Sequence, residues 1–120
     1  MSRANEVSRG TSDFDLPSGW CCYLLLCADR SYYTGITSKL ATRLRHHASG
    51  QGAGYTKGTP PVALVWYECH PERRSAASRE RQIKSWSHAK KQGLALGRKA
   101  FQGLGTCVWV SLGPPAAVSG

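Results

Sequence analysis

The sequence predicts an α+β domain that contains three strands and three helices. Three runs rich in apolar, β-branched and aromatic residues, 21–27, 31–36 and 62–67, have the length and composition of strands. Segments with apolar residues at helical spacing follow the second and the third of these runs. With 120 residues, the chain has room for one domain.

The first two strands are expected to form a hairpin. The first run is continuously apolar, which suits a strand that is buried on both faces. Residues 28–30 form a short polar turn, so Cys27 would pair with Ser31. In that register Tyr23 and Tyr33 point to the same face of the sheet, because side chains alternate along a strand. A slip of one residue would separate the two tyrosines.

The first helix follows the second strand. Leu40 and Leu44 form its buried stripe, while Arg43 and His47 repeat four residues apart on a neighbouring face. This spacing places a permanently charged guanidinium and a titratable imidazole side by side.

Polar residues and prolines mark the other boundaries. Thr37 or Ser38 is expected to cap the first helix, and Ser87 to cap the last one, which runs to about residue 96. The glycine-rich segment 50–61 is a loop, and Pro71 suits the beginning of the middle helix.

The middle helix, over 75–86, carries a carboxylate on an apolar stripe. Ala76, Glu80 and Ile83 lie on one side at helical spacing. An unpaired carboxylate is costly to bury, which favours a function for Glu80. The alternative is an exposed ion pair between Glu80 and Lys84, four residues apart, which contributes only about 0.2–0.5 kcal/mol.

Outside this segment the sequence has no clear periodicity. We expect a flexible tail over 1–19, a folded domain over 20–96 and a poorly ordered extension over 97–120, in which 108–110 is an isolated apolar patch. The first 19 residues contain no apolar run like that of a secretory signal, and no stretch has the ~20 apolar residues that span a bilayer.

The five cysteines indicate a reducing compartment. Their number is odd, and they form neither C-x-x-C pairs nor, together with the four histidines, a zinc-binding spacing. We therefore expect an intracellular, most simply cytoplasmic, protein without a disulfide scaffold or a structural zinc ion.

The charge is strongly positive, with 16 Lys and Arg residues against 7 Asp and Glu residues. The expected domain, 20–96, holds 12 of these basic and 4 of these acidic residues, so that +8 of the net +9 lies there. An excess of this size indicates an anionic partner, most simply the phosphates of a nucleic acid.

Five residues with chemically useful side chains follow one another along the domain: Tyr23, Tyr33, Arg43, His47 and Glu80. With their surroundings, they make residues 20–96 resemble a GIY-YIG nuclease domain of the small stand-alone type. Tyr23 occupies the tyrosine of the first motif, although Cys21 and Cys22 replace the usual Gly-Ile, and residues 33–35 (Tyr-Thr-Gly) fit the second motif. The spacing from Arg43 to His47, and the segment 75–77 that leads to Glu80, are also typical of this subgroup.

The resemblance implies a small three-stranded antiparallel sheet flanked by helices, and metal-dependent cleavage of DNA. Glu80 would hold one Mg²⁺ or Mn²⁺ ion, which proteins bind with only one or two carboxylates. Tyr23 would act as the general base, provided that a cation stabilises its phenolate. Tyr33 would orient the water or the phosphate, and it could share the role of base.

The resemblance also assigns roles to two residues of the first helix and to Gly35 in the second strand. Arg43 would stabilise the phosphate as charge develops in the transition state. His47 would orient a phenol or protonate the leaving oxygen. Gly35 would permit close approach of the backbone to the substrate.

Further basic and aromatic residues are candidates for contacts with the nucleic-acid backbone: Lys39, Arg45, Tyr55, Lys57, Arg73, Arg74, Arg79, Arg81 and Lys84. Together they predict binding that weakens strongly with salt. No helix resembles a base-reading element, so the expected partner is DNA without sequence preference, or RNA, and no protein partner is indicated.

The sequence therefore predicts a divalent-metal-dependent endonuclease that acts in DNA repair, recombination or processing. One alternative is a catalytically weak or inactive nucleic-acid-binding module of the same fold, which the missing Gly-Ile favours. A second alternative is a scaffold that recruits a repair complex through its tails.

Overall fold

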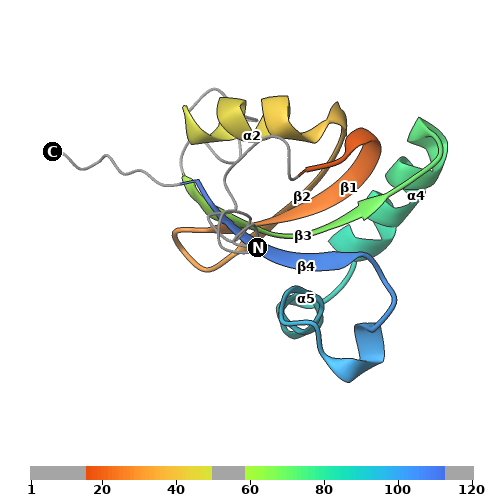
Figure 1. Cartoon of the computed structure of the whole chain (residues 1–120). Coiled ribbons are helices and arrows are strands. Elements are labelled where there is room, and N and C mark those ends of the chain that lie inside the picture. Colours follow the sequence, from red (N-terminus) through yellow and green to blue (C-terminus); the bar gives the residue numbers. More distant parts are fainter. Residues whose placement is uncertain (1–15, 50–58, 113–120) are drawn as a thin grey trace, which may run out of the picture.

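The computed structural model describes residues 16–49 and 59–112, and it has an α+β fold (Figure 1). The elements follow in the order β1 (Ser18–Cys27), β2 (Tyr32–Lys39), α2 (Leu40–Ala48), β3 (Pro61–Cys69), α4 (Arg73–Lys84), α5 (His88–Ala95), the short 3₁₀ helix η2 (Lys99–Phe101) and β4 (Thr106–Ser111). The four strands form one antiparallel sheet in the order β2-β1-β3-β4. The predicted fold class is confirmed, with one strand more than expected.

The strand β1 is buried on both faces, as its continuous apolar run predicts. Tyr23 and Leu25 pack with Leu40 and other residues of α2 on one face of the sheet. Alternate residues of β1, such as Leu24, pack on the other face with residues of α4 and α5, including Ile83. Figure 1 shows α2 on one side of the sheet and α4 and α5 on the other. A single central strand therefore contributes to two hydrophobic clusters.

The register of the β1–β2 hairpin is the predicted one. The backbone N–H of Cys27 donates to the carbonyl of Ser31 at 2.9 Å, which closes the three-residue turn. Leu25 then pairs with Tyr33, two residues along β1 from Tyr23. Tyr23 and Tyr33 consequently lie on the same face, the one that α2 covers.

The boundaries of the helices differ from the prediction in two places. The strand β2 continues to Lys39, and the hydroxyl of Thr37 accepts a hydrogen bond from the N–H of Lys39 at 3.0 Å. No side chain caps α2, so the cap expected at Thr37 or Ser38 is wrong. The helix α4 begins at Arg73, two residues after Pro71. At α5, in contrast, the side chain of Ser87 accepts from the N–H of Lys90, as expected.

The fourth strand corrects the expectation of a poorly ordered extension, as far as residue 112. The strand β4 pairs with β3, and Val110 is buried in the cluster beneath α2. The indole N–H of Trp66 donates to the carbonyl of Leu104 at 2.7 Å, which ties the connection before β4 to the sheet. Because β4 is short and its partner lies about forty residues away, its local sequence alone carries little signal.

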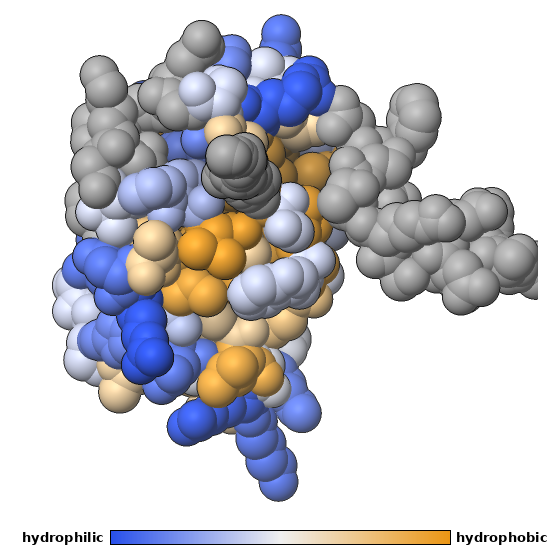
Figure 2. Space-filling view, turned by 90° about the vertical axis from the view of Figure 1, so that its left-hand side faces the viewer, coloured by the Kyte–Doolittle hydropathy of each residue, from blue (hydrophilic) through white to orange (hydrophobic). Residues whose placement is uncertain are grey.

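The surface is not uniformly charged. On the face drawn in Figure 2, hydrophobic side chains gather near the middle and hydrophilic ones surround them. Among the described residues, Leu96 and Trp109 are the large hydrophobic side chains with more than half of their surface exposed. Within residues 16–49 and 59–112, no helix is long and apolar enough to cross a membrane.

Candidate active site

Tyr23 lies at the centre of the candidate site. Its side chain is fully buried, and its Oη lies 3.1 Å from Nε2 of His47 on α2. Gly35, directly across the β1–β2 pair, makes room for the ring, because a Cβ there would lie 2.7 Å from Oη and 2.8 Å from Cζ. We expected Gly35 to admit the substrate; in the structure the space above it is filled by the Tyr23 phenol.

Three rings meet on this face of the sheet. The ring centroids of Tyr23 and Tyr33 are 6.2 Å apart, and that of His47 lies 6.0 Å from the former and 5.3 Å from the latter. The hairpin register places the two tyrosines on one face, and the helix α2 covers that face. The predicted grouping of two phenols and an imidazole is therefore present.

Burial and the neighbouring charges oppose each other at Tyr23. Burial is the largest effect and raises the pKa of the phenol well above its ordinary value. Tyr33 and the charge of Glu80 raise it further, whereas the charge of Arg43 and a hydrogen bond with its guanidinium lower it. Arg43 and Glu80 are thus both electrostatically coupled to this phenol, which remains protonated at neutral pH.

His47 is neutral at the same pH. Its side chain is 1% exposed, and burial, together with the charges of Arg43 and His46, lowers the pKa of the imidazole from 6.5 to about 4. The contact with Tyr23 therefore joins a protonated phenol to an uncharged imidazole. This arrangement allows the phenol O–H to donate to Nε2.

Glu80 lies between the apolar stripe and the solvent. Ala76 and Ile83 are buried, as the stripe predicts, and the Glu80 side chain is 21% exposed. Its Oε2 lies 3.3 Å from Nζ of Lys84, which is itself 57% exposed. The alternative reading of Glu80 was an exposed ion pair with Lys84. That ion pair does form, but the Glu80 side chain is mostly buried rather than exposed.

The donor set around Glu80 suits a hard divalent cation. The described residues contain no group of three or more His, Cys, Asp or Glu side chains that could enclose a metal ion. A single accessible carboxylate is compatible with Mg²⁺, which retains several water molecules and also binds substrate phosphates. One carboxylate is compatible with the single Mg²⁺ or Mn²⁺ ion that we expected, and a metal site at Glu80 remains a prediction.

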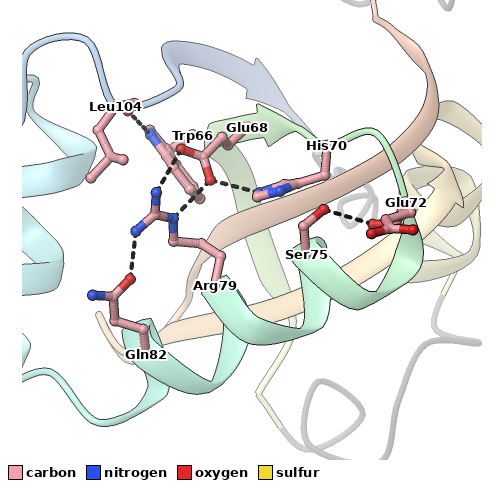
Figure 3. Close-up of polar contacts among 8 residues, drawn as sticks. All are labelled: Trp66, Glu68, His70, Glu72, Ser75, Arg79, Gln82 and Leu104. Carbon is pink, nitrogen blue, oxygen red and sulfur yellow. Dashed lines mark hydrogen bonds and ion pairs between the residues drawn. The ribbon is translucent and has the colours of Figure 1, made fainter.

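Arg79, next to Glu80 on α4, is held by the fold. Its Nε lies 2.8 Å and its Nη2 3.3 Å from the two carboxylate oxygens of Glu68 on β3, and its Nη1 donates to Gln82 (Figure 3). His70 contacts the same Glu68 carboxylate at 2.7 Å. This network attaches α4 to β3, and it occupies the guanidinium that we selected for nucleic-acid contact.

The other selected basic residues are distributed over several elements. Lys39 at the end of β2 is exposed, as is Arg45 on α2, which also hydrogen-bonds Thr42 at 3.3 Å. On α4, the guanidinium of Arg73 lies over the ring of Trp20, and Arg74 and Arg81 are exposed. The remaining two candidates, Tyr55 and Lys57, lie outside the described residues. Nucleic-acid contact remains a prediction for all of them.

The sequence analysis missed a second group of residues beside the site. A cavity of about 440 Å³ is lined by two predicted site residues, Tyr33 and Lys84. Four residues that were not predicted also line it: Tyr32, Thr34, His88 and Lys91. The Tyr32–Tyr33 doublet could have indicated this group. Adjacent strand residues point to opposite faces, so when Tyr33 lies at the active site Tyr32 lies on the other face of the sheet. The contribution of α5 had no local signal, since only the tertiary structure brings this helix to β2.

Comparison with known proteins identifies the family of this chain. Residues 19–93 match the family model described as the GIY-YIG catalytic domain. A UPF0213 protein of Haloquadratum walsbyi is 49% identical over 73 residues, which are 61% of this chain and 82% of the relative. A UPF0213 protein of Bacillus pumilus is 45% identical over 69 residues, 58% of this chain and 70% of the relative.

A similar solved structure is the solution NMR structure of a UPF0213 protein from Bacillus halodurans. It is 39% identical, covers 64% of this chain and 82% of its own, and aligns with a TM-score of 0.43. The range of the family model covers more than half of the 120 residues. The chain therefore belongs to the GIY-YIG catalytic domain family.

Proposed function

We propose that this protein is a divalent-metal-dependent endonuclease that hydrolyses DNA phosphodiester bonds with an activated water molecule. The observation that carries the proposal is the buried contact between Tyr23 and His47, 3.1 Å long, to which Arg43 and Glu80 are electrostatically coupled. A purely structural tyrosine does not need a cation such as Arg43 and a largely buried carboxylate such as Glu80 near it. An in-line displacement at phosphorus uses both kinds of group.

Tyr23 is the proposed acceptor of the proton from the attacking water. His47 orients the phenol by accepting its O–H. With its pKa lowered to about 4, His47 is too weak a base to take up that proton, and it acts as a positioning residue. The phenol must therefore become a phenolate through the charges around it.

Arg43 favours the phenolate of Tyr23, whereas the charge of Glu80 opposes it. Arg43 lowers the pKa of Tyr23 by its charge and by a hydrogen bond. The charge of Glu80 raises that pKa, so neutralising this carboxylate removes an obstacle to ionisation. A Mg²⁺ or Mn²⁺ ion bound to Glu80 would supply this neutralisation and would stabilise the charge that develops on the phosphate.

The bond changes then balance. The Tyr23 phenol first loses its own proton to bulk water. The water oxygen then forms a bond to phosphorus as one of its protons moves to the phenolate Oη, and the bond from phosphorus to the leaving oxygen breaks, the leaving oxygen taking a proton from solvent water. The Arg43 guanidinium stabilises the extra negative charge on the phosphoryl oxygens. Tyr33, whose ring centroid lies 6.2 Å from that of Tyr23, is the residue that we propose orients the water or the phosphate.

The test is the nicking of supercoiled plasmid by the full chain in Mg²⁺ and in EDTA. Glu80→Gln and Tyr23→Phe should each lower the metal-dependent rate by more than about a hundredfold, as expected when a catalytic group is removed. Glu72→Gln, which changes an exposed glutamate just before the same helix, is the matched control and should keep the wild-type rate.

Each other outcome has a definite meaning. Full activity of Glu80→Gln would overturn the site assignment. Binding of DNA by the wild-type protein without any metal-dependent cleavage, across linear, branched and single-stranded substrates, would instead favour the non-catalytic binding module.

A further inference from the structure

A cavity of about 440 Å³ lies at the outer edge of β2, beside Tyr33 of the candidate active site. The strand β2 is first in the sheet order, so one of its edges has no strand neighbour among the described residues. We call this cavity the β2 pocket and define it by residues of β2, α4 and α5: Tyr32, Thr34, Lys84, His88 and Lys91. Its volume falls within the range of roughly 300–1,000 Å³ that is typical of ligand pockets.

The charge of the β2 pocket favours an anion. Lys84 and Lys91 line it from two helices, and none of the described residues that line it is acidic. Lys84 also forms an ion pair with the carboxylate of Glu80, 3.3 Å away, which offsets part of its charge. Tyr33 of the candidate active site lines the same pocket, so a phosphate group between the two ammonium groups would lie beside the proposed reaction centre.

The aromatic side chains of the pocket suit a planar ring. Tyr32 and His88 are in contact, with ring centroids 5.2 Å apart and planes inclined by 37°. The Nε2 of His88 lies 2.8 Å from the carbonyl oxygen of Arg30, which can only accept, so Nε2 carries the hydrogen. In the neutral imidazole, Nδ1 is then a hydrogen-bond acceptor, and nucleobases carry amino and imino groups that donate to such an atom.

A buried hydroxyl completes the pocket. Thr34 is 2% exposed, and its Oγ1 has no hydrogen-bond partner among the described residues. A buried polar group without a partner costs about 1–3 kcal/mol, so such groups are normally satisfied by protein, water or ligand. Thr34 lines the pocket, and this hydroxyl becomes a partner for a polar atom of an occupant once a small movement of the wall uncovers Oγ1.

We propose that the β2 pocket binds one unpaired nucleotide of the strand that the proposed endonuclease cuts. The base stacks on Tyr32 and hydrogen-bonds Thr34 or His88, while an adjacent phosphate contacts Lys84 and Lys91. A base within a duplex is stacked on both faces and cannot enter such a pocket, so the substrate is single-stranded or locally opened. The proposal rests on the proposed function only for the identity of the strand, and binding itself requires no cleavage.

The test is the binding of a fluorescent single-stranded DNA 12-mer, and of a hairpin duplex that contains the same strand, to the metal-free full chain in EDTA. Lys91→Ala should weaken binding of the single strand at least about fivefold and reduce its salt slope by about 0.7. Lys90→Ala removes the same charge from the adjacent residue, which does not line the pocket, and should change the affinity less than twofold.

Two further variants separate stacking and hydrogen bonding from folding. Tyr32→Leu retains much of the side-chain volume, and it should weaken binding of the single strand at least about fivefold while the duplex is little affected. Thr34→Val removes a hydroxyl that has no partner in the fold, so it should leave the melting temperature unchanged or raised and still weaken binding. Thermal unfolding of each variant verifies that it is folded.

The proposal is overturned if Lys91→Ala affects binding no more than Lys90→Ala does. It is also overturned if the folded Tyr32→Leu and Thr34→Val variants bind the single strand as the wild type does, or if duplex and single strand lose affinity equally. These results leave the proposed endonuclease untouched, because that proposal depends on the metal-dependent cleavage by the wild-type chain and on Glu80.

Discussion

Tyr23 and His47 share a hydrogen bond of 3.1 Å, although they come from the central strand of the sheet and from the helix that covers it. Both side chains are almost completely buried, and neither is charged at neutral pH. The bond therefore contributes to the packing of α2 on the sheet, and it also fixes the phenol that we propose as the general base. Several predictions about stability and pH depend on this dual role.

Acidification should destabilise the protein through His47. Its pKa is lowered from 6.5 to about 4 in the folded state, so the unfolded chain binds the proton more readily between these values. The stabilising contribution is fully present above pH 6.5 and is lost as the pH falls to about 4. At about 1.36 kcal/mol per pH unit, the loss is on the order of 3 kcal/mol.

Urea unfolding at pH 7, 5.5 and 4 measures this effect as the difference between wild type and His47→Gln, because the other titrating groups are common to both proteins. The variant should start less stable and lose less stability on acidification. Parallel curves for the two proteins would show that His47 is protonated equally in the folded and unfolded states.

Gly35→Ala should destabilise the site specifically through Tyr23. The new Cβ would lie 2.7 Å from the phenol oxygen, and its three nearest atoms all belong to that ring. Overpacking of this kind costs about 1–3 kcal/mol, and the displaced phenol should also lower the cleavage rate.

A double-mutant cycle tests the cause of this effect. In a Tyr23→Ala background, the same Gly35→Ala change should cost much less than in the wild type, as measured by chemical unfolding. Equal costs in both backgrounds would place the conflict elsewhere in the backbone.

Arg79→Ala should destabilise the fold more than Arg81→Ala does. Arg79 contacts both carboxylate oxygens of Glu68 and is partly buried, whereas Arg81 on the same helix is exposed. We expect a loss of about 1–2 kcal/mol for the former, because it leaves a hydrogen-bonded carboxylate with one partner fewer, and less than about 0.5 kcal/mol for the latter.

The two variants also separate the structural and nucleic-acid roles of Arg79. If the network in Figure 3 positions α4, Arg79→Ala should reduce cleavage more than it reduces DNA binding. A loss of DNA affinity greater than that of Arg81→Ala, with normal stability, would support the direct contact that the sequence suggested.

Removal of β4 should destabilise the domain, whereas removal of residues 113–120 should not. A chain that ends at Leu104 lacks Val110 and the strand that covers β3. Loss of one buried valine and its backbone hydrogen bonds should lower the unfolding free energy by at least about 2 kcal/mol. A chain that ends at Leu112 keeps the whole strand and is the control.

Urea midpoints of the two truncated chains and the full-length chain give this comparison directly. Similar midpoints for the chains that end at residues 104 and 112 would mean that β4 contributes little and that the folded unit ends before it.

Much of this protein was determined by its sequence alone. The continuous run of β1 and the three-residue turn predict a register with Tyr23 and Tyr33 on one face, and the structure has that register and not the one shifted by a residue. Helical spacing likewise brought Arg43 and His47 together, and the stripe around Glu80 was recognisable because its period is local. These inferences succeed because they depend on contacts between residues close in sequence.

The tertiary structure decided what depends on residues far apart in the chain. The strand β4 forms because β3 offers it an edge, the guanidinium of Arg79 is held by Glu68 on another element, and α5 brings Lys91 to Tyr32. The pKa of His47 likewise follows mainly from burial of its side chain between α2 and the sheet, and only in part from its neighbours Arg43 and His46. These contacts and pKa values depend on packing, because burial and charge act through space. The local sequence of one segment does not indicate which other segment packs against it.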